Sequence, residues 1–197
     1  FGCLLGYEKI SDEMKDEELK KLVETIGYKE GLPVVVNPGV LDPKEFIDTV
    51  LQVRVPNPFM PDTPQRIATD TSQKLAIRFG ETIKAYVEKY GDASRLTALP
   101  LGIAGWLRYM LAVDDAGKKY ELAPDPMNEE IQEQLKDIVV GQPETFTDQL
   151  RPILSNERLF FIDLYKAGVG EKVENMFREM IAGPGAIKAT IHKYVNA

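Results

Sequence analysis

The sequence predicts a mostly α, multi-helical single domain over residues 1–197. Apolar residues recur at the three- and four-residue spacing of helix faces from one end of the chain to the other. A hydrophobic content of 44% in 197 residues is enough to form a substantial core. No Gly-x-Gly-x-x-Gly segment follows a strand pattern, so we do not expect a dinucleotide-binding sheet in these residues.

Two helices are predicted in the N-terminal quarter of the chain. Ser11 and the acidic residues after it indicate the start of a helix that ends before Gly27. Asp42 and Pro43 are typical of an N-cap followed by a first-turn proline, and they predict a helix over 43–51. Between them, residues 32–36 are the one plausible strand, and Pro33 limits this segment to an edge strand or an extended connector.

Three helices are predicted in the middle of the chain, over 62–71, 75–90 and 94–113. Gly91 closes the second of them. The third is nearly apolar, but Arg108 and several Gly and Pro residues interrupt it, so we expect a core helix and not a membrane span. Arg108 must then either reach solvent or pair with a carboxylate.

The C-terminal third is predicted to be helical over 127–140, 144–154, 157–182 and 185–195. Gly183-Pro184-Gly185 predicts a sharp corner between the last two helices. His192, the only histidine, lies in the last helix without residues nearby that could form a catalytic triad, so we expect it at the surface.

Charge and cysteine content exclude several function classes. The net charge of −7 and the pI near 4.9 argue against nucleic acid as a partner, because phosphate binding needs clustered Lys and Arg. Cys3 is the only cysteine, so no intrachain disulfide forms, and one Cys with one His makes a Cys/His metal site improbable. We expect a cytoplasmic location, without a signal peptide or a membrane partner.

Residues 57–74 contain the most informative cluster of polar residues. Asn57-Pro58 and Met60-Pro61 restrict the backbone before Arg66 and Lys74, and this rigid entry suits an anion or polyol site. The Arg fork could clamp a carboxylate while Lys adds a mobile charge. Asn57 could contact a substrate hydroxyl, although Asn before Pro is also a turn former.

The acidic residues near these two cations have a structural alternative. Asp70 lies four residues from both Arg66 and Lys74, so a solvated helix face with ion pairs at this spacing is a competing interpretation. Asp62 and Asp70 could act as general acids or bases, but we favour an N-cap and a helix-face partner.

The chain resembles the C-terminal domain of the long-chain mannitol dehydrogenase and D-mannonate oxidoreductase family. The resemblance rests on an ordered set of motifs: Gly2-x-x-x-Gly6-Tyr7-Glu8, Glu30-Gly31-Leu32-Pro33-Val34, Asn57-Pro58, Asp62, Arg66-Ile67-Ala68-x-Asp70-x-Ser72-x-Lys74, Ile103-Ala104-Gly105-Trp106-Leu107-Arg108-Tyr109 and Asp125-Pro126. It implies a helical fold like the C-terminal domain of 6-phosphogluconate dehydrogenase, covering nearly the whole chain.

The resemblance also implies a function. Family members oxidise a secondary alcohol with NAD, without a metal, and bind NAD through an N-terminal Rossmann domain that is absent from these residues. A Lys-x4-Asn-x2-His catalytic motif is expected upstream of Phe1, so no catalytic residue is expected in this fragment, which alone should be inactive. Arg66 and Lys74 match the family's substrate-contacting cations.

Several substrates and one other class of protein stay open at this stage. D-Mannonate with D-fructuronate is the first expectation, and a mannitol 2-dehydrogenase or a tagaturonate reductase is the alternative. The partners would be a small sugar acid or polyol and the chain's own Rossmann domain. A helical interaction module without chemistry is the rival class, but it does not account for the rigid turn before the two cations.

Overall fold

The computed structural model describes residues 1–60 and 62–197, so the predicted restriction at Met60-Pro61 lies partly outside the described residues. Helices dominate these residues, as predicted, and they contain two isolated β-bridges but no strand. The α-helices have the following bounds: α1 Ile10–Glu13, α2 Glu17–Glu24, α3 Pro43–Asp48, α4 Pro64–Ile67, α5 Thr71–Lys74, α6 Glu81–Tyr90, α7 Ala98–Tyr109, α8 Asn128–Leu135, α9 Arg151–Leu154, α10 Glu157–Phe160, α11 Gly170–Met180 and α12 Ala186–Val195.

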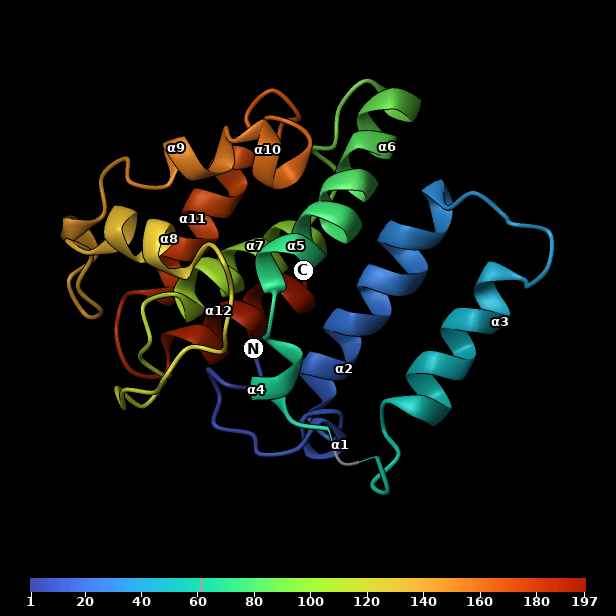
Figure 1. Cartoon of the computed structure of the whole chain (residues 1–197), viewed down its shortest axis with the longest axis horizontal. Helices are drawn as coiled ribbons and strands as arrows, with labels where there is room; N and C mark the ends of the chain where they lie inside the picture. The colour runs from blue at the N-terminus through green and yellow to red at the C-terminus, as the bar shows by residue number, and fades with distance from the viewer. Residues whose placement is uncertain (61) are drawn as a thin grey trace.

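Helix α7 is the centre of the core. Eleven of its residues, including Ile103 and Trp106, are buried, and its most extensive packing is with α11. Figure 1 shows α2 and α3 side by side at one end of the molecule and α8 and α9 at the other, with α7 between them. Within the described residues, no helix is both long and apolar enough to cross a bilayer, so α7 is a core helix as predicted.

The prediction for Arg108 was wrong in both of its alternatives. The side chain is fully buried on α7, and it donates to the carbonyl oxygens of Met180 at 3.2 Å and Val113 at 2.6 Å, with a longer contact to Asp114 O at 3.4 Å. Burial lowers the pKa of the guanidinium. Backbone carbonyls therefore satisfy this cation and connect α7 to the end of α11.

Several helix boundaries differ from the predicted ones for local reasons. The first long helix is capped by Asp16 and not by Ser11, because the Asp16 carboxylate accepts from Glu18 N at 3.0 Å and Leu19 N at 3.3 Å. The predicted strand is a single 3-10 turn, Leu32–Val34. The predicted start at Asp42-Pro43 is confirmed, since Asp42 accepts from the amides of Lys44 and Glu45.

The helix predicted over 75–90 starts earlier in the structure than predicted, whereas two helices predicted in the C-terminal third are interrupted. The backbone stays helical from α5 through the π-helical segment Leu75–Gly80 and α6, until Gly91 (φ 89°) ends it as predicted. The predicted helices over 144–154 and 157–182 were wrong, because each is interrupted: α9 covers only the end of the first, and Phe161 (φ 61°) separates α10 from α11 in the second.

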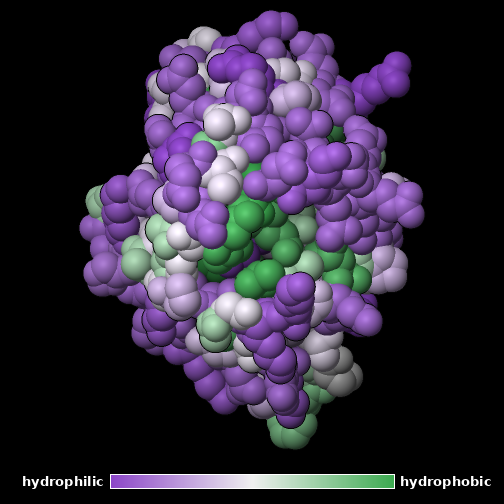
Figure 2. All heavy atoms as spheres, turned by 90° about the vertical axis from the view of Figure 1, so that its left-hand side faces the viewer, coloured by the Kyte–Doolittle hydropathy of each residue, from purple (hydrophilic) through white to green (hydrophobic). Residues whose placement is uncertain are grey.

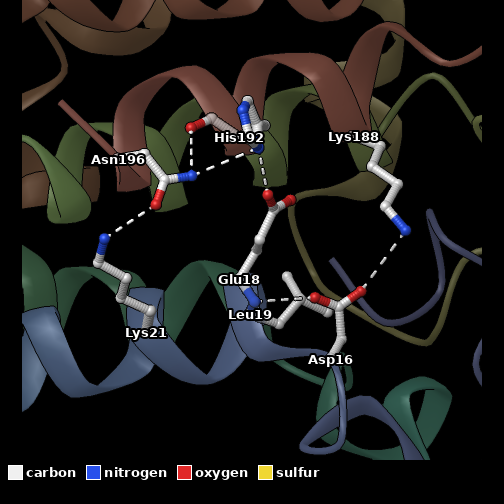
Figure 3. A network of polar contacts seen from close by, with 7 residues as sticks. All are labelled: Asp16, Glu18, Leu19, Lys21, Lys188, His192 and Asn196. Atoms are coloured by element: carbon white, nitrogen blue, oxygen red, sulfur yellow. Dashed lines mark hydrogen bonds and ion pairs between the residues drawn. The ribbon is translucent and has the colours of Figure 1, made fainter.

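The last helix folds back onto the first long one. Asp16, Glu18 and Lys21 on the α2 side face Lys188, His192 and Asn196 on the α12 side (Figure 3). His192 Nδ1 contacts Glu18 Oε1, and Lys21 Nζ donates to Asn196 Oδ1 at 2.9 Å. His192 is exposed, as predicted, and it connects the two ends of the chain.

Asp16 gives this α2–α12 contact a pH dependence. Burial acts to raise its pKa, but hydrogen bonds from Tyr7 and from the amides of Leu19 and Glu18, with Lys188 nearby, hold the pKa below its ordinary value of 3.8. A carboxyl whose pKa is depressed on folding stabilises the fold above that ordinary value, and this stability is lost as the pH falls through the folded pKa.

We therefore expect Asp16→Asn to lower the free energy of unfolding by about 1 kcal/mol near pH 7, because asparagine can still cap α2 but lacks the charge that favours the helix dipole, Lys188 and the hydrogen bond from Tyr7. The variant should also lose less stability than the wild type when the pH falls below about 4. Urea unfolding at several pH values measures both effects, with the exposed Asp137→Asn as the control. Parallel pH profiles for wild type and Asp16→Asn would contradict the assignment.

Candidate substrate-binding site

Helix α4 holds the first of the two predicted cations. Thr63 caps this helix by accepting from Arg66 N at 3.1 Å, and Pro64 occupies its first turn. The Arg66 side chain is 70% exposed, and its Nε donates to Asp62 Oδ1 at 2.6 Å while Nη2 contacts Asp62 Oδ2. The hydrogen bonds from Arg66 hold the pKa of Asp62 below its usual range.

Helix α5 holds the second cation. Lys74 Nζ donates to Ile67 O at 2.9 Å and to Thr69 O at 2.5 Å, so it satisfies carbonyls at the end of α4 and in the turn that follows. An ammonium group has three donors, and one is left after these two bonds. Lys74 therefore connects α4 to α5 and keeps the two cations in one local unit.

The turn between these helices replaces the continuous helix predicted for 62–71. Asp70 has a left-handed backbone (φ 53°), and its amide donates to Pro124 O at 2.9 Å. The predicted ion pairs of Asp70 with Arg66 and Lys74 do not form, since Arg66 pairs with Asp62 and Lys74 binds carbonyls. Asp62 is thus the ion-pair partner of Arg66. The N-cap of α4 is Thr63, and not Asp62 as predicted.

Asn57 has a turn-forming role in the structure. Its Oδ1 accepts from Phe59 N at 2.9 Å, and its backbone carbonyl accepts from Met60 N at 3.1 Å. This is the Asx-type turn that Asn commonly forms beside proline. The structure therefore shows the turn-forming role of Asn57, and the contact of its side chain with a substrate hydroxyl stays a prediction.

Ser72 and Asp125 hold the start of α5, the helix that contains Lys74, and the sequence patterns alone did not predict this contact. Ser72 is 2% exposed, and its hydroxyl and amide donate to the two carboxylate oxygens of Asp125 at 2.6 and 2.7 Å. Asp125 also accepts from Met127 N at 2.9 Å. Both residues belong to the motifs that carry the family resemblance, and their spacing of 53 residues hid the contact.

The first residues of the chain pack against α4. A Cβ added to Gly2 would lie 2.6 Å from Pro64 Cγ and 2.5 Å from Glu13 Oε2, so only glycine allows this approach. An apolar cavity of about 370 Å³ lies here, with Phe1, Pro64 and Ile67 among its lining residues. Figure 1 shows the N-terminus next to α4, which places residues 1–2 close to the helix that contains Arg66.

Burial raises the pKa of Glu13, which borders the same cavity. A second cavity of about 480 Å³ lies beside α5 and is lined by Ser72, Gln73 and Arg158, among others. The face on the side of α8 and α9 is mainly hydrophilic around an apolar hollow (Figure 2). The two predicted cations thus lie on short helices bordered by two cavities.

Comparison with solved structures identifies the fold. Mannitol 2-dehydrogenase of Pseudomonas fluorescens, solved in a ternary complex with NAD and D-mannitol, superposes with a TM-score of 0.81 over 99% of this chain and 37% of that chain. At 20% sequence identity, this likeness defines the fold alone. The helical fold predicted from the sequence is thereby confirmed.

Residues 1–181 match the mannitol dehydrogenase C-terminal domain, and the chain belongs to this family. The D-mannonate oxidoreductase of Thermotoga maritima is 54% identical over 100% of this chain and 36% of that protein. The mannitol 2-dehydrogenase of Pyricularia oryzae is 30% identical over 99% of this chain and 36% of that protein. The chain therefore spans about a third of the length of these relatives.

Proposed function

We propose that this chain is the C-terminal, substrate-binding domain of an NAD-dependent oxidoreductase that interconverts a sugar-acid secondary alcohol and its ketone, with D-mannonate and D-fructuronate as the substrate pair. The 54% identity to a D-mannonate oxidoreductase over the whole chain is the observation that carries this proposal. Mannitol 2-dehydrogenase or tagaturonate reductase activity is the alternative. A helical interaction module has no comparable support.

In this proposal, Arg66 and Lys74 bind the substrate. Arg66 is exposed and keeps donors beyond those bound to Asp62, and Lys74 keeps one donor after its two carbonyl bonds. A cation with several donors is suited to a sugar carboxylate or to vicinal hydroxyls. Asn57 would contribute by holding the turn that precedes α4.

The remaining parts of the reaction belong to the parent protein. The catalytic Lys, Asn and His of the family would come from residues before Phe1, and the packing of Gly2 on Pro64 would bring that segment beside α4. A Rossmann domain would hold NAD, which supplies the hydride acceptor. This chemistry uses no metal, and we propose that the parent enzyme is cytoplasmic.

NADH consumption by the full-length parent, measured on D-fructuronate, D-tagaturonate and D-fructose, tests the proposal. We expect D-fructuronate to have the highest kcat/KM. Arg66→Ala should raise KM for D-fructuronate about thirtyfold, corresponding to about 2 kcal/mol, and KM for D-fructose much less, because only the sugar acid carries a carboxylate.

Arg151→Ala, which changes an exposed arginine of α9 that lines neither cavity, is the matched control and should leave both KM values within about twofold. A preference of the parent for D-fructose would favour mannitol 2-dehydrogenase instead. An equal rise of both KM values in Arg66→Ala would exclude a carboxylate clamp. No turnover of any of the three ketones would refute the proposed function.

A further inference from the structure

Asp62 is more firmly held than the arginine with which it pairs. Its side chain is 18% exposed, compared with 70% for Arg66. Its Oδ1 accepts from Thr63 N at 3.0 Å, its amide donates to Met60 O at 2.8 Å, and its carbonyl accepts from Ile10 N at 3.1 Å. Asp62 is therefore fixed by the turn before α4 and by the start of α1, independently of Arg66.

The pair uses one edge of the Arg66 guanidinium. The Nε and Nη2 atoms face the two oxygens of Asp62, and this side-on arrangement takes two of the five N–H donors. Because the guanidinium is planar, the other donors, on Nη1 and the second Nη2 position, point away from Asp62 along the end-on edge. That edge can still form a bidentate contact with one carboxylate.

An unpaired arginine on a four-residue helix would sample many rotamers. Arg66 has four rotatable side-chain bonds and lies at the third position of α4. The bidentate contact to an anchored carboxylate removes most of that freedom before any ligand binds, which is the condition for selective binding of a planar anion. An ion pair that only stabilised the helix would not require the partner to be held by three further backbone contacts.

We propose that Asp62 is a positioning residue, which fixes Arg66 so that its end-on edge faces the carboxylate of the substrate. The proposal rests on the proposed function, since it presumes a sugar-acid substrate. Asp62 does not touch that substrate and acts through Arg66. Its loss should therefore weaken sugar-acid binding, leave turnover at saturation unaffected, and have no effect once Arg66 is gone.

A double-mutant cycle in the full-length parent tests this positioning role, with KM and kcat measured on D-fructuronate and D-fructose. We expect Asp62→Asn to raise KM for D-fructuronate about tenfold, with kcat and the KM for D-fructose within about twofold. In the Arg66→Ala background, Asp62→Asn should change nothing further. Asp62→Glu keeps the carboxylate and should retain KM within about threefold of the wild type.

Asp48→Asn is the matched control, because Asp48 forms an exposed pair with Lys44 at the same four-residue spacing. It should leave all four parameters unchanged. Additive effects of Asp62→Asn and Arg66→Ala, an equal rise of KM for both substrates, or a fall of KM for D-fructuronate would overturn the positioning role. If the wild-type parent turned over no sugar acid, the proposed function itself would fail, and this inference with it.

Discussion

Arg108→Met should lower the free energy of unfolding of the 197-residue chain by about 3–4 kcal/mol. Methionine keeps most of the apolar stem, so packing within α7 changes little. The loss comes from the carbonyls of Met180 and Val113, which would be left in the core without the donors that Arg108 provides. Hydrogen bonds to a charged group contribute about 1.5–3 kcal/mol each, and a backbone carbonyl cannot be removed to compensate.

Urea unfolding of wild type and variant measures this difference. Arg158→Met, at an exposed arginine of α10, is the control and should change stability by less than about 0.5 kcal/mol. A loss of less than about 1 kcal/mol in Arg108→Met would mean that water or a shifted backbone satisfies the carbonyls. The buried arginine would then be replaceable by an apolar residue, as other buried ions are.

Glu30→Ala is the second large effect that we expect, with a loss of about 3 kcal/mol. Glu30 is 5% exposed, and its carboxylate accepts from the amide of the N-cap residue, Thr97 N at 2.7 Å, and from the first two amides of α7, Ala98 N at 2.8 Å and Leu99 N at 2.7 Å. The Thr97 side chain does not cap the helix, so Glu30 replaces a local N-cap from 67 residues away. Its negative charge also complements the helix dipole.

Glu30→Gln separates these two contributions. The amide retains one acceptor oxygen but turns an NH2 group toward backbone N–H donors. We therefore expect the free energy of unfolding of Glu30→Gln to lie between those of the wild type and Glu30→Ala. Urea unfolding is again the measurement, and the exposed Glu88→Ala is the control. Equal stability of wild type and Glu30→Ala would show that solvent reaches the start of α7 and hydrates its amides.

Capping and turn residues in the sequence correctly predicted the helix ends that neighbouring residues determine. Asp42-Pro43 starts α3, Gly91 ends α6, and α12 has nearly the predicted bounds. The break at Phe161 was not predictable in this way. The backbone of Phe160 lies against Gly80, where a Cβ would be 2.0 Å from Phe160 O, so a contact between residues 80 positions apart decides where α10 ends.

For the candidate site, the sequence indicated which residues to consider but not the contacts that they form. The spacing of Arg66 and Lys74 within a proline-rich turn, together with the resemblance, pointed to both cations as candidates, and their contact with a substrate stays a prediction. Their partners were not identified, because the prediction assumed a continuous helix, whereas the left-handed backbone at Asp70 interrupts the helix between α4 and α5. Asp125, which holds the start of α5 through Ser72, lies too far along the sequence for any local pattern to indicate it.

The position of α12 has a practical consequence for dissecting this protein. The match to the family model ends at residue 181, although the D-mannonate oxidoreductase of Thermotoga maritima aligns over the whole chain. Ile187 and Ile191 of α12 are fully buried in the core, and the helix packs on α2, α7 and α11. A truncation at residue 181 would remove α12 and expose the apolar surface of these three helices to water. The unit that folds therefore extends beyond the segment that matches the family model, and expression boundaries should follow the packing of α12.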